Sequence, residues 1–199
     1  MELLELYNEM LRLFSVEDCS GLERAMMDAV IACDVEKYDK ASKLFPDLEH
    51  DWLQKIFQYY RADRDEKKQD FTPSSLAQFL AALTDGDSQE LVDMCAGSGA
   101  LTIQAWVRNK NRFFRLYELD GAVIPYLLFN LAVRNMNAEV LHGDVLSDKK
   151  LHKYTVTSGN KYSTVSVENY DDDEPDKQPA VQRTVAPSGK NSQFSLLGM

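Results

Sequence analysis

The sequence predicts an α/β fold in which a helical N-terminal segment precedes a parallel sheet with helical crossovers. Three observations support this prediction. Apolar residues recur at helical spacing through residues 1–66. Short apolar runs then alternate with helix-like segments between residues 72 and 144. Each of the three apolar runs leads into an acidic residue, and the first is followed by a loop that contains two glycines, "AGSG".

The first predicted region, residues 1–68, is helical. Apolar stripes at helix spacing occupy residues 3–14, 22–33 and 52–60, and each stripe is typical of a helix that packs one face against a core. The sequence Ser20–Glu23, "SGLE", fits a capping box and predicts the start of the second helix. We therefore expect three helices in this region.

The second predicted region, residues 69–168, contains the sheet. Thr72 and Pro73 fit an N-cap and a first helical position. Later helices are predicted at residues 99–109 and 120–135. The predicted strands are short and apolar, and they are Leu91–Met94, Phe113–Glu118 and Ala138–His142. Strands that alternate with helices at such short intervals indicate a parallel sheet.

The last part of the chain changes character. Residues 154–168 alternate between polar and apolar, which predicts a β-hairpin with its turn at Ser158–Asn160. Residues 169–199 form the third predicted region, an acidic and polar tail that we expect to be disordered. Part of the acidity is concentrated in Glu168–Lys177, which has six acids and one base.

The composition excludes several classes of protein. The net charge of −10 does not support a general nucleic-acid-binding surface. We expect no membrane span, because no run of 18 apolar residues occurs, and no signal peptide, because no basic region precedes an apolar run. The three cysteines and three histidines lack the spacing of a disulfide framework or a metal site. A reducing cytoplasm and no bound metal are therefore expected.

The glycine loop and the acids at the strand ends predict a ligand site. Gly97 and Gly99 permit positive φ and close backbone approach, and amides at the start of the following helix can receive a polar group. Glu118 lies nineteen residues after Gly99, where a carboxylate can bind ribose hydroxyls. Asp93 and Asp144 are expected at the same sheet edge, although Asp144 alone fits a turn former equally well. A cofactor with a nucleoside is the natural prediction.

One alternative cofactor is a nicotinamide dinucleotide. Its fingerprint requires a third glycine at position 102, where this sequence has Thr102. A nicotinamide-dependent oxidoreductase is therefore disfavoured, and binding of NADH without binding of S-adenosylmethionine would revive it.

Four motifs together resemble those of the N6-adenine DNA methylases. They are "QDFTP" (69–73), "DMCAGSGALTIQAW" (93–106), "YELD" (117–120) and "GDVL" (143–146), and the resemblance covers about residues 50–167. The nearest branch is the one related to type I restriction-modification methylation subunits. The resemblance implies a class I methyltransferase with a Rossmann-like parallel sheet, S-adenosylmethionine (SAM) as cofactor and DNA as substrate.

The resemblance also implies roles for individual positions. Phe71, Thr72 and Pro73 would flank the methionine end of SAM. The loop residues would cradle the cofactor, Glu118 would hold the ribose and Asp144 the adenine. The loop residues are Asp93, Ala96, Gly97 and Gly99.

One motif of the family is absent. These enzymes flip the target adenine out of the duplex. In this family an Asn/Asp-Pro-Pro-Tyr/Phe sequence after the fourth strand holds the flipped base. None of the six prolines is adjacent to another or follows Asn or Asp. A full sheet in this family has seven strands, with the fourth beside the first. The sequence thus predicts only the N-terminal half of that sheet, with the first strand unpaired on one side.

Three explanations for the missing motif remain open. The chain is a methylase truncated or frame-shifted before the catalytic motif, one piece of a split enzyme whose second chain supplies the rest, or a degenerate methylase kept as a binding module. The first two predict the SAM-binding portion of a DNA adenine-N6 methyltransferase that is inactive alone. The third predicts a non-catalytic interaction protein that binds a partner subunit or a defence-system component. The polar tail favours truncation.

Overall fold

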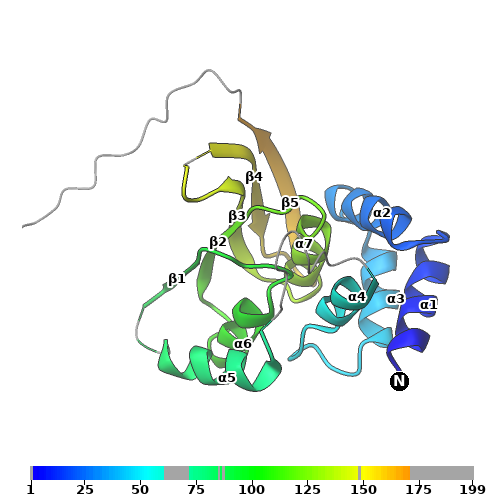
Figure 1. Cartoon of the computed structure of the whole chain (residues 1–199), viewed down its shortest axis with the longest axis horizontal. Helices are drawn as coiled ribbons and strands as arrows, with labels where there is room; N and C mark the ends of the chain where they lie inside the picture. Colours follow the sequence, from blue (N-terminus) through cyan, green and yellow to red (C-terminus); the bar gives the residue numbers. More distant parts are fainter. Residues whose placement is uncertain (1, 61–71, 85, 87, 148, 171–199) are drawn as a thin grey trace, which may run out of the picture.

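The structure, a computed structural model, describes residues 2–60, 72–84, 86, 88–147 and 149–170. In this part of the chain a five-stranded sheet has the strand order β1-β2-β3-β4-β5. Helices α1–α4 are grouped at one end of the molecule next to α7, and α5 and α6 lie together below β1 (Figure 1). The α/β class predicted from the sequence is confirmed. The predicted tail lies outside the described residues from position 171 onward.

The N-terminal region contains α1 (Leu3–Phe14), α2 (Cys19–Ile31), α3 (Val35–Leu44) and α4 (Trp52–Tyr60). The sequence predicted three of these helices and missed α3. Only two of its residues, which lie at helix spacing, are buried, so its apolar stripe is short.

The predicted capping box at the start of α2 is wrong. The helix begins at Cys19, and its cap is Asp18, whose carboxylate accepts a hydrogen bond of 2.7 Å from the backbone amide of Gly21. The acid two residues earlier therefore caps the helix, and the amide that it binds is that of Gly21 rather than that of Glu23, the partner expected for Ser20.

The sheet begins with three parallel strands, β1 (Glu90–Asp93), β2 (Phe113–Glu118) and β3 (Asn137–Asp144). These strands confirm the predicted parallel arrangement. The predicted hairpin is also present, as β4 (Lys149–Thr157) and β5 (Thr164–Asn169). The sequence did not show that β4 pairs antiparallel with β3, which extends the sheet beyond β3.

The remaining helices are α5 (Ser74–Leu83), α6 (Ala100–Arg108) and α7 (Ile124–Val133). Helix α5 begins one residue later than predicted, with Pro73 at its N-cap and no side-chain cap. Helix α7 is shorter than the predicted 120–135. Residues 121–123 form a turn instead, which the Asp120 carboxylate stabilises by accepting a hydrogen bond from the amide of Ala122.

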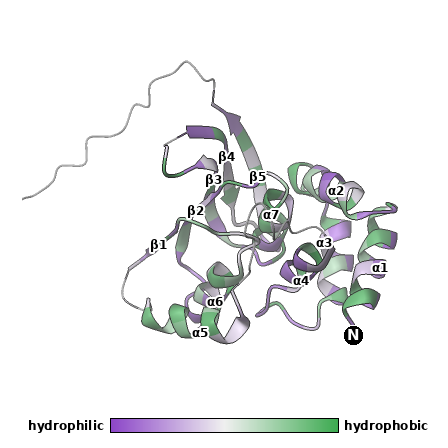
Figure 2. Ribbon diagram, in the orientation of Figure 1, coloured by the Kyte–Doolittle hydropathy of each residue, from purple (hydrophilic) through white to green (hydrophobic). Residues whose placement is uncertain are grey.

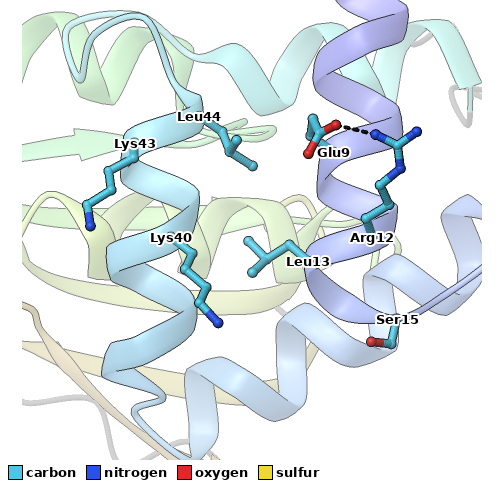
Figure 3. Close-up of a pocket in the computed structure, with 7 residues that line it drawn as sticks. All are labelled: Glu9, Arg12, Leu13, Ser15, Lys40, Lys43 and Leu44. Atoms are coloured by element: carbon cyan, nitrogen blue, oxygen red, sulfur yellow. Dashed lines mark hydrogen bonds and ion pairs between the residues drawn. The ribbon is translucent and has the colours of Figure 1, made fainter.

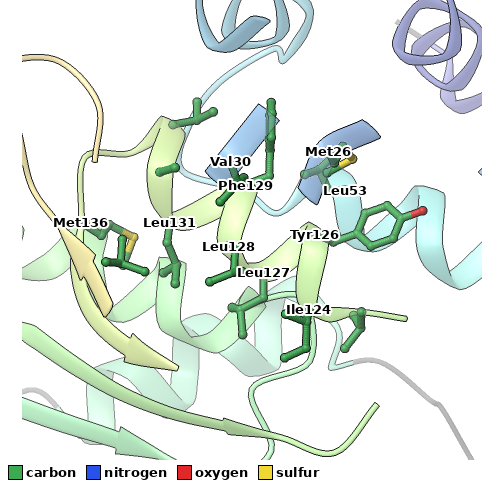
Figure 4. Close-up of a cluster of buried hydrophobic side chains, with 14 of the residues drawn as sticks. Met26, Val30, Leu53, Ile124, Tyr126, Leu127, Leu128, Phe129, Leu131 and Met136 are labelled. Atoms are coloured by element: carbon green, nitrogen blue, oxygen red, sulfur yellow. The ribbon is translucent and has the colours of Figure 1, made fainter. Parts of the chain in front are cut away.

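Helix α7 is the centre of the hydrophobic core. All ten of its residues are buried, as expected for a helix that is apolar on every side. It contacts α2 and α4 on one side and strands β3–β5 on the other. Figure 4 shows the apolar side chains of α7 packed with Met26 and Val30 of α2 and Leu53 of α4; those labelled on α7 include Tyr126, Leu127, Leu128, Phe129 and Leu131. The N-terminal helices and the sheet therefore share one core.

The opposite face of the sheet carries a row of alternating charges, one from each strand. Arg115 of β2 contacts Glu90 of β1 (2.9 Å) and Glu139 of β3 (3.7 Å). Lys153 of β4 contacts Glu139 (3.0 Å) and Glu168 of β5 (3.8 Å). Side chains alternate between the two faces of a strand, so these charges face away from α7. This face of the sheet therefore suits contact with solvent rather than with a further apolar layer.

An apolar surface lies instead beside β1. Within the described residues β1 pairs only with β2, so it is an edge strand. Helix α5 packs on α6 and buries only its small residues Ala77 and Ala81, whereas its large residues Leu76, Phe79 and Leu83 are exposed. Figure 2 shows α5 as a largely hydrophobic helix. We call Leu76, Phe79 and Leu83 the α5 apolar face.

Across the described residues, no helix is both long and apolar enough to cross a membrane.

Candidate functional site at the ends of the parallel strands

The glycine loop joins β1 to α6 in the conformation that its sequence predicts. Gly97 has φ of 56° and Gly99 has φ of 100°, values in the left-handed region that favours glycine. The amide of Gly99 closes a turn on the carbonyl of Ala96 (2.9 Å), and the amide of Ala96 donates to the carbonyl of Tyr117 (2.9 Å). A Cβ atom at Gly99 would lie 3.0 Å from Leu127 of α7. The loop is therefore held between β2 and α7.

Glu118, at the end of β2, is bound to this loop. One of its carboxylate oxygens accepts from the amide of Gly97 and the other from the amide of Asp120, both at 2.7 Å. Burial raises the pKa of Glu118, and the two backbone hydrogen bonds oppose that rise. A carboxylate oxygen can accept two hydrogen bonds, so Glu118 retains acceptor capacity for a ligand.

Asp93, at the end of β1, is the second carboxylate at the loop. It accepts a hydrogen bond of 3.1 Å from the amide of Cys95, and burial raises its pKa. The pKa of the exposed Cys95 thiol is raised by partial burial and by the charges of Asp93 and Glu118. The structure thus brings both predicted acids close to one position in the loop.

Asp144 is the acid at the end of β3. Its two oxygens accept from the amide of Leu146 (2.9 Å) and the hydroxyl of Ser147 (2.8 Å), and these bonds lower its pKa. Asp144 therefore forms a turn, as one of the two sequence interpretations proposed. Its position at the same sheet edge as Glu118 follows from the parallel register of β2 and β3.

An apolar side chain follows the acid at each strand end. Met94 follows Asp93, Leu119 follows Glu118, and Val145 follows Asp144, and all three apolar residues are exposed. A single exposed apolar residue is ordinary, but these three follow the ends of three neighbouring strands. Sequence reasoning missed these residues. The signal was present as an acid followed by an apolar residue at each of the three strand ends.

A family model of the N-6 DNA methylases matches residues 47–196. This chain belongs to the N-6 DNA methylase family. The match includes α4, the glycine loop and all five strands of the sheet. The mixed α/β architecture is consistent with a methylase fold. No curated protein and no solved structure matches the chain.

The upstream motif of this methylase-family chain is only partly described. Phe71 lies outside the described residues. Thr72 is half-buried and Pro73 is exposed. The carbonyl of Thr72 accepts a hydrogen bond of 3.3 Å from the side chain of Gln54, so α4 anchors this segment.

A set of buried polar residues near the methylase loop was also missed. Asp51, Ser98, Asn130 and Arg134 are all buried and hydrogen-bonded to one another or to nearby backbone. Ser98 lies in the glycine-loop motif, but the other three residues belong to no motif and are far from it in the sequence, so no pattern in the sequence could have grouped the four.

A groove of about 560 Å³ lies between α1 and α3, away from the loop. Figure 3 shows its lining residues, and Figure 1 places α1 and α3 at the opposite end of the molecule from β1. Its cations are largely engaged already, since Arg12 pairs with Glu9 and Lys40 with Glu36. No group of three His, Cys, Asp or Glu side chains in the described part of the chain is arranged to hold a metal ion. The strand ends therefore remain the candidate site.

Proposed function

We propose that this chain binds SAM at the ends of β1, β2 and β3, as the cofactor-binding portion of a DNA adenine-N6 methyltransferase of the restriction-modification type. The observation that carries the proposal is the bond between Glu118 and the amide of Gly97, which joins the strand-end carboxylate to the glycine loop. Family membership supports the same reaction class. When bound, SAM supplies an electrophilic methyl group on a sulfonium sulfur.

The site has the chemistry that this cofactor requires. The loop residues Asp93, Ala96, Gly97 and Gly99 would cradle SAM, and Glu118 would accept hydrogen bonds from the ribose hydroxyls with its remaining acceptor capacity. The carboxylates at the loop favour a ligand with positive charges, and SAM carries both a sulfonium and an ammonium group.

The adenine end needs an apolar surface and a polar edge. Met94, Leu119 and Val145 offer the apolar surface. In this proposal Asp144 accepts from the adenine amino group while it also stabilises its own turn. The segment Phe71, Thr72 and Pro73 would flank the methionine end, as in the family that the sequence resembles.

We further propose that these 199 residues do not transfer the methyl group by themselves. Transfer to an adenine amino group needs acceptors that hold the exocyclic nitrogen, and the sequence has no Asn/Asp-Pro-Pro motif. The acceptors and the main DNA contacts would come from elsewhere, either further residues or a second chain. We expect these further residues or this second chain to attach at the edge of β1 and at the α5 apolar face. An added strand would pair with the backbone of β1, and apolar side chains would cover the α5 apolar face.

A second candidate is a non-catalytic interaction protein on a methylase scaffold, which would bind a partner subunit or a defence-system component. The α5 apolar face favours it, because this surface is exposed whether or not the loop binds SAM. Both candidates fit the cytoplasm, and no disulfide links the three cysteines. The two differ in whether the loop binds SAM.

Isothermal titration calorimetry with SAM tests the proposal, with S-adenosylhomocysteine and NADH as comparison ligands. We expect SAM to bind with micromolar affinity and NADH not to bind. Asp93→Asn should abolish SAM binding. Glu90→Gln is the matched control, because Glu90 lies at the other end of the same strand and pairs only with Arg115 among the ion pairs described. A folded sample that does not bind SAM would refute the cofactor proposal and favour the interaction protein.

A transfer assay tests the inactivity. Purified chain is incubated with SAM labelled in its methyl group and with DNA that contains adenine. We expect no label in the DNA. Labelled N6-methyladenine formed by the chain alone would show that acceptors exist within these residues and would refute this part of the proposal.

A further inference from the structure

A buried hydrogen bond ties the glycine loop to the N-terminal helical region. Ser98 lies between the two positive-φ glycines and is 1% exposed. Its hydroxyl donates to a carboxylate oxygen of Asp51 (2.6 Å), 47 residues earlier. Its carbonyl accepts from the side-chain amide of Asn130 on α7 (2.9 Å). Both the side chain and the backbone of Ser98 are therefore fixed from outside the loop.

Asp51 is held rigidly where it meets Ser98. It lies directly before α4, and its second carboxylate oxygen accepts from the backbone amide of Gln54 (2.8 Å), which caps that helix. The same oxygen accepts from the side-chain amide of Asn130 (2.8 Å). The carboxylate that accepts from Ser98 is thus also held by two other donors, the amide of Gln54 and the side chain of Asn130.

Arg134, directly after α7, completes the network. Its guanidinium donates to the carbonyls of Leu48 (2.8 Å) and His50 (2.7 Å), which fixes the segment that leads to Asp51. It also donates to the side-chain oxygen of Asn130 (2.8 Å), so the Asn130 amide must direct its NH₂ group toward Asp51 and Ser98. Burial raises the pKa of the Asp51 carboxyl, and the nearby guanidinium of Arg134 opposes that rise.

Stability alone does not account for this arrangement. Burying a carboxylate and a guanidinium has a desolvation cost, and apolar contacts already hold α4 against α7. The network ends on the glycine loop, and its two glycines would leave its backbone free to adopt other conformations. Fixing Ser98 removes that freedom.

We propose that Asp51 and Ser98 are positioning residues for the cofactor loop, so that the segment before α4 sets the conformation in which the loop receives its ligand. The inference rests on the proposed function for the identity of that ligand, SAM. It also makes the helical N-terminal region a part of the cofactor site.

The test compares two serines in the full chain. Ser98→Ala removes the hydroxyl at the loop. Ser163→Ala is the matched control, because Ser163 is also fully buried and its hydroxyl also makes one hydrogen bond, 2.8 Å to the carbonyl of Met136. Two properties are measured for each variant. The first is the rate at which N-ethylmaleimide alkylates Cys95 in the loop, which peptide mass spectrometry follows. The second is the SAM dissociation constant.

We expect Ser98→Ala to raise the alkylation rate of Cys95 and the SAM dissociation constant by about tenfold each, the factor typical of one lost charge-assisted hydrogen bond. Ser163→Ala should change neither, although both variants lower the melting temperature. If the two variants behave alike in both measurements, the positioning role is refuted.

The outcomes also separate this inference from the proposed function. Wild-type chain that does not bind SAM, together with faster alkylation in Ser98→Ala, would refute SAM binding and support the positioning role. If Ser98→Ala does not fold, Asp51→Asn replaces it, because its amide can still cap α4 and contact Ser98 without charge. N-ethylmaleimide must then alkylate Cys95 faster in Asp51→Asn than in Ser163→Ala. An equal rate in the two variants refutes the inference.

Discussion

The carboxylate of Glu118 accepts a hydrogen bond of 2.7 Å from the backbone amide of Gly97, so the end of β2 holds the loop that follows β1. Its other oxygen binds the amide of Asp120. The residue that we propose as a ribose ligand therefore also shapes the loop. In the proposed function, binding and folding would share this side chain.

Glu118→Ala should consequently lower stability as well as abolish SAM binding. Two backbone amides, those of Gly97 and Asp120, lose their acceptor in this variant. We expect a loss of about 1–3 kcal/mol in the free energy of unfolding, measured by urea denaturation without ligand. Glu90→Ala, which removes only a half-exposed ion pair with Arg115, should cost less than about 1 kcal/mol. Equal losses in the two variants would contradict the structural role.

The affinity for SAM should depend on pH. Burial raises the pKa of Asp93 above 3.8 and that of Glu118 above 4.5, and both must be ionised to bind a cationic ligand fully. Affinity should therefore weaken as the pH falls from neutral toward the ordinary carboxyl range, and the weakening should begin before unperturbed carboxyls would titrate. Calorimetry across this range measures it. An affinity that is constant over the range would contradict the prediction.

The contribution of Asp93 and Glu118 to the stability of the ligand-free chain should change with pH in the opposite direction to the SAM affinity. A raised pKa means that the folded state binds the proton more tightly than the unfolded state does. The contribution of Asp93 and Glu118 to stability is thus fully present below their ordinary values of 3.8 and 4.5. It is lost as the pH rises through the raised values. Replacing both by Asn and Gln should reduce this part of the pH dependence in urea titrations.

Gly99→Ala should distort the loop. Gly99 has φ of 100°, and a Cβ atom there would meet Leu127 at 3.0 Å. We expect a loss of about 1–2 kcal/mol in stability, together with weaker SAM binding. Gly86→Ala is the control, because a Cβ atom at Gly86 meets nothing within 4 Å. Unchanged binding in a folded Gly99→Ala variant would mean that the loop conformation is not needed for the ligand.

Trp106→Ala should affect stability rather than the site. The ring is buried on α6, and Lys110 lies 5.0 Å from its centre. We expect a loss of about 3–5 kcal/mol on unfolding, from the lost burial and the cavity. Lys110→Ala removes only the cation–π contact and should cost about 1 kcal/mol or less. A comparable loss in both variants would show that the ring contributes little beyond that contact.

The α5 apolar face should cause self-association when no partner is present. Large exposed apolar patches drive contacts between molecules. Leu83→Ser should reduce the association seen by analytical ultracentrifugation without lowering stability. Leu4→Ser on α1 is matched in exposure, at 60% against 66% for Leu83, and should have no effect. A wild-type chain that stays monomeric at high concentration would argue against an exposed docking surface.

The regular elements show where sequence patterns succeed. The loop glycines and the strand-end acids were predictable because positive φ and strand termination are local properties. Helix α3 was missed because only Tyr38 and Ala41 of its residues are buried, so its stripe is too short to recognise. The cap of α2 was misplaced because Asp18 and Ser20 are both good caps and the local sequence does not choose between them.

By itself, the sequence determined the three parallel strands, the positions of the loop glycines that adopt positive φ, and the family of the chain. Only the tertiary structure decided that Asp51 meets Ser98, that β4 extends the sheet beyond β3, and that charges from Glu90 to Glu168 cross its open face. The physical reason is range. Backbone conformation and hydrophobic periodicity depend on neighbours in the chain, whereas the partner of a buried polar group or an edge strand depends on which distant segments fold against it.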